Sequence, residues 1–122
     1  MEIAVDFDGT CVTHGYPKVG KDIGAIPVLK ELVSKGHKLI LYTMRSGIEL
    51  THAVDWFEIN NISLYGIQYN PTQKDWTKSN KCYAQLYIDD AALGCPLIYG
   101  EHKKPFVDWL TIKELLKTKG IL

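Results

Sequence analysis

The sequence lacks a net charge, a long apolar run and a set of cysteines spaced for metal binding. Its 14 lysines and arginines balance 14 aspartates and glutamates, so no overall field draws the chain to nucleic acid or membrane, although a local basic patch is compatible with this balance. No apolar stretch approaches the roughly 20 residues that span a bilayer, and the first residues lack the basic segment of a signal peptide. Cys11, Cys82 and Cys95 are odd in number and not in metal-type spacing, which indicates reduced thiols without a catalytic role. These absences predict a cytoplasmic protein that does not bind membranes.

What the chain does contain predicts one compact α/β domain over residues 1–122, because 122 residues are too few for two domains. Apolar runs typical of strands alternate with segments of helical periodicity. Strands are expected at 2–7, 39–42, 64–69 and 85–88, and helices at 24–35, 48–60 and 106–118. We expect a turn and a small flap over 9–20, a short helix or loop over 74–83, and loops around the run 97–99. This order predicts a three-layer α/β/α fold, in which helices cover both faces of a central parallel sheet.

Two acidic pairs follow two of the predicted strands. Asp6 and Asp8 come after the first strand, and Asp89 and Asp90 come after the strand 85–88. Because ligands of parallel α/β sheets bind outside the carboxyl ends of the strands, we expect the four carboxylates to converge there. Two such charges about 4 Å apart repel by roughly 4 kcal/mol at an effective dielectric constant near 20. A cation would relieve this repulsion, and hard oxygen ligands suit Mg²⁺.

Each pair also has a purely structural interpretation. Asp8 and Gly9 are typical turn residues that could simply end the first strand, and Asp89-Asp90 could be a solvated turn. The functional interpretation is that one carboxylate of Asp6 and Asp8 acts as a nucleophile while the other transfers protons.

Other polar residues near these strand ends are candidates for binding a phosphate group. Thr43 ends the strand 39–42 and could donate its hydroxyl, or could instead cap the following helix. Arg45, the only arginine in the chain, could recognise a phosphate or form a surface ion pair. Lys81 could neutralise the nucleophile and the phosphate, with Lys78 as its rival, because Lys74, Lys78 and Lys81 would share one stripe of a helix. His14, in the predicted flap, is more typical of a structural residue.

Together these features resemble the haloacid dehalogenase superfamily of phosphohydrolases. The first motif of that superfamily, Asp-x-Asp-Gly-Thr, matches residues 6–10, and its acidic pair after a strand matches Asp89-Asp90. A threonine that ends a strand matches Thr43, and Lys81 is the choice for the loosely defined lysine. The matches occur in the expected order over about three quarters of the chain.

The resemblance implies a role for each matched position. Asp6 would be the nucleophile that forms an aspartyl-phosphate, and Asp8 would protonate the leaving group and then activate water. The Asp6 carboxylate, the Asp8 main-chain carbonyl and Asp89 or Asp90 would hold Mg²⁺. Thr43 and Lys81 would bind the phosphoryl oxygens, and phosphoryl transfer depends mainly on such positioning and charge neutralisation.

The chain has no room for the cap domain that many members of the superfamily carry. It therefore resembles the small capless hydrolases, whose open site accepts a phosphate on a large molecule or is covered by another subunit, such as a second copy of the chain. We expect a phosphorylated small molecule or nucleotide as substrate. A polynucleotide end or a phosphoprotein is the second substrate class, and Ala91 speaks against nucleic acid because some polynucleotide phosphatases carry arginine there.

A phosphorylatable receiver module is the main alternative that is not an enzyme. It has a similar length, a parallel sheet, acids, a threonine and a lysine. A receiver carries its adjacent acids after the first strand and its phosphoacceptor after a middle strand, whereas here the first strand ends in Asp-x-Asp and the adjacent acids come late. A phospho-ligand-binding protein is a further alternative, although every expected catalytic side chain is present.

Overall fold

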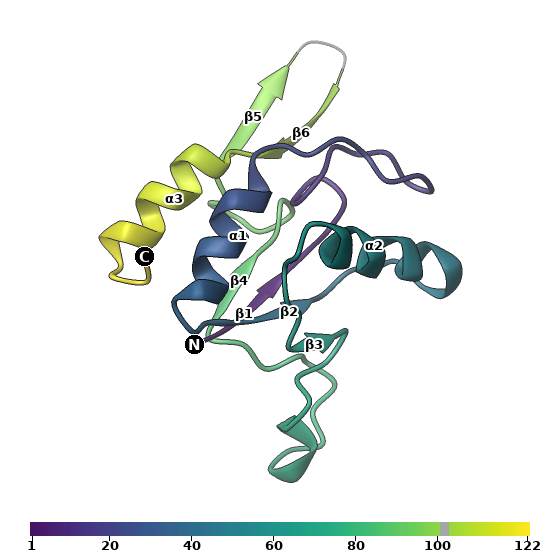
Figure 1. The fold of residues 1–122 in the computed structure, drawn as a ribbon, viewed down its shortest axis with the longest axis vertical. Coiled ribbons are helices and arrows are strands. Elements are labelled where there is room, and N and C mark those ends of the chain that lie inside the picture. The colour runs from purple at the N-terminus through teal and green to yellow at the C-terminus, as the bar shows by residue number, and fades with distance from the viewer. Residues whose placement is uncertain (101–102) are drawn as a thin grey trace.

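The computed structural model describes residues 1–100 and 103–122, and His102 of the sequence lies outside them. Figure 1 shows an α/β fold in which a small sheet is flanked by helices. The elements, in chain order, are β1 (Glu2–Val5), α1 (Ala25–Ser34), β2 (Lys38–Leu41), α2 (Gly47–Ile59), β3 (Gly66–Ile67), the 3-10 turn η1 (Gln73–Asp75), β4 (Leu86–Ile88), β5 (Leu97–Gly100), β6 (Lys103–Val107) and α3 (Trp109–Thr118).

Four strands form the main sheet, in the order β3-β2-β1-β4, and all its pairings are parallel. Val5 lies beside Leu41 on one side and Ile88 on the other, so the three strands end level with one another. This confirms the predicted parallel sheet. It also means that the residues following Val5, Leu41 and Ile88 leave the sheet at one edge.

The α-helices pack against a single face of this sheet. Alternate sheet residues enter one hydrophobic cluster together with residues of all three α-helices found in the described segments. The sheet residues in that cluster are Ile3, Val5, Leu39, Leu41 and Ile88. Ala4 and Ile40 are buried but lie outside it, because successive strand residues point to opposite faces.

The expectation of helices on both faces was therefore wrong. Moving from β1 to β2 and from β2 to β3 takes two steps in one direction, and right-handed crossovers then place α1 and α2 on the same face. Helix α3 lies beside α1, where Lys113 forms an ion pair with Glu31 at 3.5 Å (Figure 1). The connection from β3 to β4 would need a helix to cover the second face, and it forms only the turn η1.

The last helix begins later than its periodicity predicts. Phe106 and Val107, expected in the helix, belong to β6 and pair with Ile98 and Leu97 of β5 in a separate two-stranded sheet. The helix begins after Asp108, whose carboxylate accepts hydrogen bonds from the main-chain N–H and the hydroxyl of Thr111. This N-cap is a stronger start signal than an apolar residue at helical spacing.

The segment after β1 forms the predicted flap. The main-chain N–H of Thr13 donates to Lys21 O at 2.8 Å, and the N–H of Lys21 donates to the Thr13 hydroxyl at 2.9 Å. These two bonds close a loop over residues 13–21, which we call the flap. Separately, none of the helices in residues 1–100 and 103–122 is long and apolar enough to cross a bilayer.

Candidate active site

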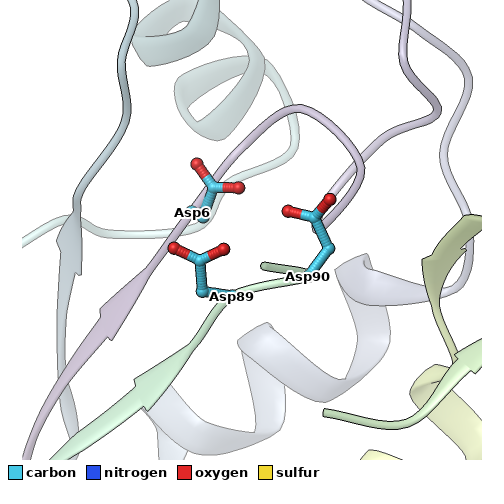
Figure 2. A group of neighbouring side chains, drawn as sticks. All are labelled: Asp6, Asp89 and Asp90. Atoms are coloured by element: carbon cyan, nitrogen blue, oxygen red, sulfur yellow. The ribbon is translucent and has the colours of Figure 1, made fainter. Parts of the chain in front are cut away.

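Three carboxylates meet where β1 and β4 end. Asp6 follows β1, and Asp89 and Asp90 follow β4, so the parallel pairing of these strands brings residues more than 80 positions apart together. One carboxylate oxygen from each lies within 4.8 Å of the others. Figure 2 shows the three side chains turned toward a common centre. Of the four carboxylates predicted to converge, Asp6, Asp89 and Asp90 do so, whereas Asp8 lies outside this group.

This crowding changes the acidity of Asp6. Its pKa is raised from the ordinary 3.8 to about 8, first because burial disfavours the charged form, and then through the hydrogen bond with Asp90 and the charge of Asp89. Hydrogen bonds from the Phe7 main chain and the Thr10 hydroxyl act in the opposite direction. A cluster that holds a proton so tightly is one that a divalent cation would stabilise, and three carboxylates supply the hard oxygen donors that Mg²⁺ prefers.

Thr10 joins two of these acids, a role that the sequence did not predict. This fully buried residue places its hydroxyl 3.0 Å from Asp6 Oδ2 and 3.1 Å from Asp90 Oδ1. The single hydroxyl proton can be donated to only one of them at a time. The same oxygen accepts the main-chain N–H of Asp90 at 3.0 Å. Thr10 therefore fixes the end of β4 against the end of β1.

Replacing Thr10 with valine should destabilise the protein. Valine keeps the shape but leaves the Asp90 N–H without its acceptor, which is expected to lower the free energy of unfolding by about 1–3 kcal/mol. Urea denaturation measures this loss. The control is Thr51→Val on the exposed side of α2, which should change stability by no more than about 0.5 kcal/mol. Equal stabilities for the two variants would contradict the bridging role of Thr10.

Gly9 brings the flap close to the carboxylates. Its φ is +77°, and a Cβ atom there would lie 2.3 Å from the His14 ring and 2.7 Å from Asp90 Oδ2. His14 Nε2 lies 3.5 Å from Asp90 Oδ2 and 3.0 Å from the carbonyl of Pro105. His14 thus connects the flap to Asp90 and to β6, a structural position consistent with the sequence interpretation.

Asp8 is held by Arg45 and is not part of the three-carboxylate group. Arg45 Nε donates to Asp8 Oδ2 and Nη2 donates to Oδ1, both at 2.8 Å. The remaining guanidinium N–H groups donate to the carbonyls of Pro17, Lys18 and Glu49. All five N–H groups of this buried arginine are therefore engaged within the protein.

This arrangement gives Arg45 a different role from the predicted one. With each donor occupied, the guanidinium has none left for a substrate phosphate. It positions Asp8 and ties the flap to the loop after β2. The position of the lone arginine near Thr43 indicated a role at the site. The sequence did not show whether its guanidinium binds the phosphate of a ligand or a carboxylate of the protein itself.

Thr43 lies at the mouth of the site. A pocket of about 210 Å³ is lined by Asp6, Tyr42, Thr43, Met44 and Asp89. The side-chain amide of Gln68 forms two hydrogen bonds with the main chain of Thr43. It accepts the Thr43 N–H at 2.8 Å and donates to the Thr43 carbonyl at 2.6 Å. Gln68 has a φ of +69°, an uncommon conformation outside glycine, and no sequence pattern predicted this support. The pocket is below the usual size for a drug-like ligand and fits a smaller group such as phosphate.

The predicted lysine stripe does not form. Lys74 lies in η1, whereas Lys78 and Lys81 lie in the irregular segment that follows. Lys81 Nζ sits over the ring of Tyr87, 5.5 Å from its centroid, and Tyr87 precedes Asp89 by two residues on β4. Lys78 lines a separate pocket with residues of the β3–β4 connection. Of the two rivals, Lys81 is therefore the one that contacts the strand leading to the acids.

The three cysteines are free thiols, two of them buried. Burial is the first cause that raises the pKa of the Cys11, Cys82 and Cys95 thiols. A raised pKa disfavours the reactive thiolate. Their free state is the one that the sequence interpretation expects.

The fold and this edge define an α/β domain with an acidic cluster at the carboxyl ends of a parallel sheet. No family model and no curated protein matches the chain. It is similar to a solved structure described as a conserved protein from Bacteroides thetaiotaomicron, with 37% sequence identity, a TM-score of 0.80, and coverage of 98% of this chain and 91% of that one. The chain belongs to the family of that conserved protein, whose description names no activity.

Proposed function

We propose that this protein is a Mg²⁺-dependent phosphomonoesterase that works through an aspartyl-phosphate, as its resemblance to the capless haloacid dehalogenase phosphatases implies. The observation that carries the proposal is the meeting of Asp6, Asp89 and Asp90 within 4.8 Å at the carboxyl edge of the sheet. Hydrolysis of phosphate esters makes direct use of such an edge, because the reaction needs a nucleophile, a cation and a small pocket in one place.

The chemical steps assign one task to each residue. A carboxylate oxygen of Asp6 would attack phosphorus, and the bond from phosphorus to the ester oxygen would break. The departing oxygen would take a proton from Asp8. Water would then attack the phosphorus of the aspartyl-phosphate while Asp8 accepts its proton, releasing inorganic phosphate and restoring Asp6.

The remaining residues support these steps. Asp6, Asp89 and Asp90, with the Asp8 main-chain carbonyl, would hold Mg²⁺, which supplies positive charge that offsets the carboxylates and the phosphate. Thr43 would donate its hydroxyl to a phosphoryl oxygen, and Lys81, from the irregular segment before β4, would offset the charge of the phosphate. Asp8 must leave the Arg45 fork to carry a proton to the substrate, because both of its oxygens are engaged in the pair.

Phosphate release from p-nitrophenyl phosphate tests the proposal. We expect turnover with Mg²⁺, its loss when a chelator is added, and its return when Mg²⁺ is restored. A chelator that leaves the rate unchanged would contradict the assignment of a metal to the acidic cluster. Phosphorylated sugars, nucleotides and oligonucleotides, tested in parallel, would identify the substrate class.

A further inference from the structure

The face of the sheet opposite the helices carries tyrosines next to the candidate active site. Tyr87 pairs with Ala4, and Tyr42 follows Leu41 at the end of β2. Alternation along the strands directs both side chains to the same face as Ala4 and Ile40. Each tyrosine is 37% exposed. The strand β1 lies between β4 and β2, and its residue beside Tyr87 is the small Ala4. The side chains of Tyr87 and Tyr42 can therefore form one surface across β1.

More aromatic residues border this surface. The Tyr87 hydroxyl donates a hydrogen bond to the main-chain carbonyl of Cys82, which holds the segment that carries Tyr83 against β4. The ring of Tyr83 makes an edge-on contact with Trp76 at 5.2 Å between centroids. Trp76 is 61% exposed. We call Tyr42, Tyr83, Tyr87 and Trp76 the aromatic face.

Positive charge adjoins the aromatic face at Lys81, in a chain that has no net charge. Residues 68–88 contain three lysines, at positions 74, 78 and 81, and a single carboxylate, Asp75. Lys81 Nζ lies over the Tyr87 ring, an arrangement that adds positive charge to a stacking surface. A ligand that fits this surface combines flat rings with negative charge.

The aromatic face runs directly into the pocket of the candidate active site. Tyr42 belongs to both, since it lines the pocket together with Asp6 and Asp89. The pocket of about 210 Å³ is smaller than the sites that enclose a whole drug-sized ligand. The rest of such a ligand would therefore lie on neighbouring surface, and the nearest aromatic surface begins at Tyr42.

We propose that the aromatic face binds a single-stranded oligonucleotide and directs its terminal phosphate into the Asp6 pocket. Stacking of bases on exposed rings, assisted by lysines along the backbone, is the usual means of binding single strands without sequence preference. Ala91, where some polynucleotide phosphatases carry arginine, is offset here because stacking and lysines hold the strand. This inference names the substrate class of the proposed phosphatase and rests on that function.

Fluorescence anisotropy with a labelled eight-nucleotide single strand tests the binding. The strand is used with a 3′-phosphate, with a 5′-phosphate and without either. We expect Tyr87→Ala to weaken binding about tenfold, as expected for the loss of one stacked base, and Tyr87→Phe to retain it. The control is Tyr99→Ala, which removes an exposed tyrosine from β5 on the separate hairpin and should leave binding unchanged.

Parallel hydrolysis of p-nitrophenyl phosphate separates this inference from the proposed function. Because Lys81 lies over the Tyr87 ring, a second variant of the aromatic face is used for this comparison. Trp76→Ala removes an exposed ring that packs on Tyr83. It should weaken oligonucleotide binding yet hydrolyse this small substrate at the parental rate, which also shows that the variant is folded. A wild-type protein that hydrolyses it but binds no oligonucleotide, or that loses equal affinity through Tyr87→Ala and Tyr99→Ala, would overturn the aromatic-face proposal alone. So would a dimer in sedimentation that Tyr87→Ala dissociates, because a second copy would then occupy the face. Tyr87-dependent binding without any hydrolysis would support the face and overturn the phosphatase.

Discussion

Asp6→Asn is expected to abolish Mg²⁺-dependent phosphate release from p-nitrophenyl phosphate. Asparagine has nearly the same shape, but its neutral amide cannot attack phosphorus as a carboxylate does. Loss of the nucleophile of a covalent mechanism typically lowers kcat by a factor of about 10³ or more. Without it no covalent intermediate forms, and the remaining groups cannot replace that step. Asp6 is also one of the three carboxylates that meet at the strand ends, so the same change weakens cation binding.

Initial rates with the same enzyme concentration give the comparison. Asp55→Asn, an exposed aspartate on α2, is the matched control and should keep the parental rate. Circular dichroism of both variants establishes that they are folded. If Asp6→Asn retained more than about a hundredth of the activity, Asp6 would not be the nucleophile.

The metal-free protein is expected to lose stability as the pH rises from about 4 to about 8. Asp6 has an ordinary pKa of 3.8 in an unfolded chain and a pKa of about 8 in the folded one. Between these values the folded state holds a proton that the unfolded state has released, so the free energy of unfolding falls with each pH unit. Below the window both states are protonated, and above it both are ionised, so the loss from Asp6 is complete near pH 8.

Thermal unfolding with a chelator present, at pH 5 and pH 8, measures this effect. One pKa unit corresponds to about 1.4 kcal/mol, so we expect a loss on the order of 2 kcal/mol or more at pH 8. Mg²⁺ should restore stability at pH 8 more than at pH 5, where protons compete for the carboxylates.

Asp6→Asn isolates the contribution of this one group, because asparagine does not titrate. The difference in stability between the parent and this variant should therefore depend on pH, with the variant gaining relative to the parent as the pH rises. For Asp55→Asn the difference from the parent should be flat. A parent and an Asp6→Asn variant with parallel pH profiles would show that the cluster holds no proton.

Sequence reasoning located the acids well because their positions follow from topology. Apolar runs before Asp6 and Asp89 marked two strands, and parallel strands end at a common edge, so the meeting of these residues could be predicted without coordinates. The elements α1 and α2 were also found to within about one residue at each end, and glycines mark both ends of α1 and the start of α2. For these elements, the hydrophobic pattern within each segment and the packing of the whole fold favour the same structure.

The features that could not be predicted from the sequence are contacts between segments far apart in the chain. The binding of Arg45 to Asp8 joins residues 37 positions apart, and the grip of Gln68 on Thr43 joins residues 25 apart. Periodicity carries no information on such pairs. The hairpin β5–β6 was missed because Phe106 and Val107 also fit the helical register that follows them, and only the Asp108 cap separates the two structures.

All the described α-helices pack on one face of the sheet. As a result, the residues that stabilise the fold and the residues that can contact a ligand lie on opposite faces. Residues that hold the fold together, such as Val5 and Leu41, point into the helical layer. Tyr42 and Tyr87 point the other way and remain partly exposed. Substitutions of these two partly exposed side chains can therefore alter what the protein recognises, while the interior that determines folding stays the same.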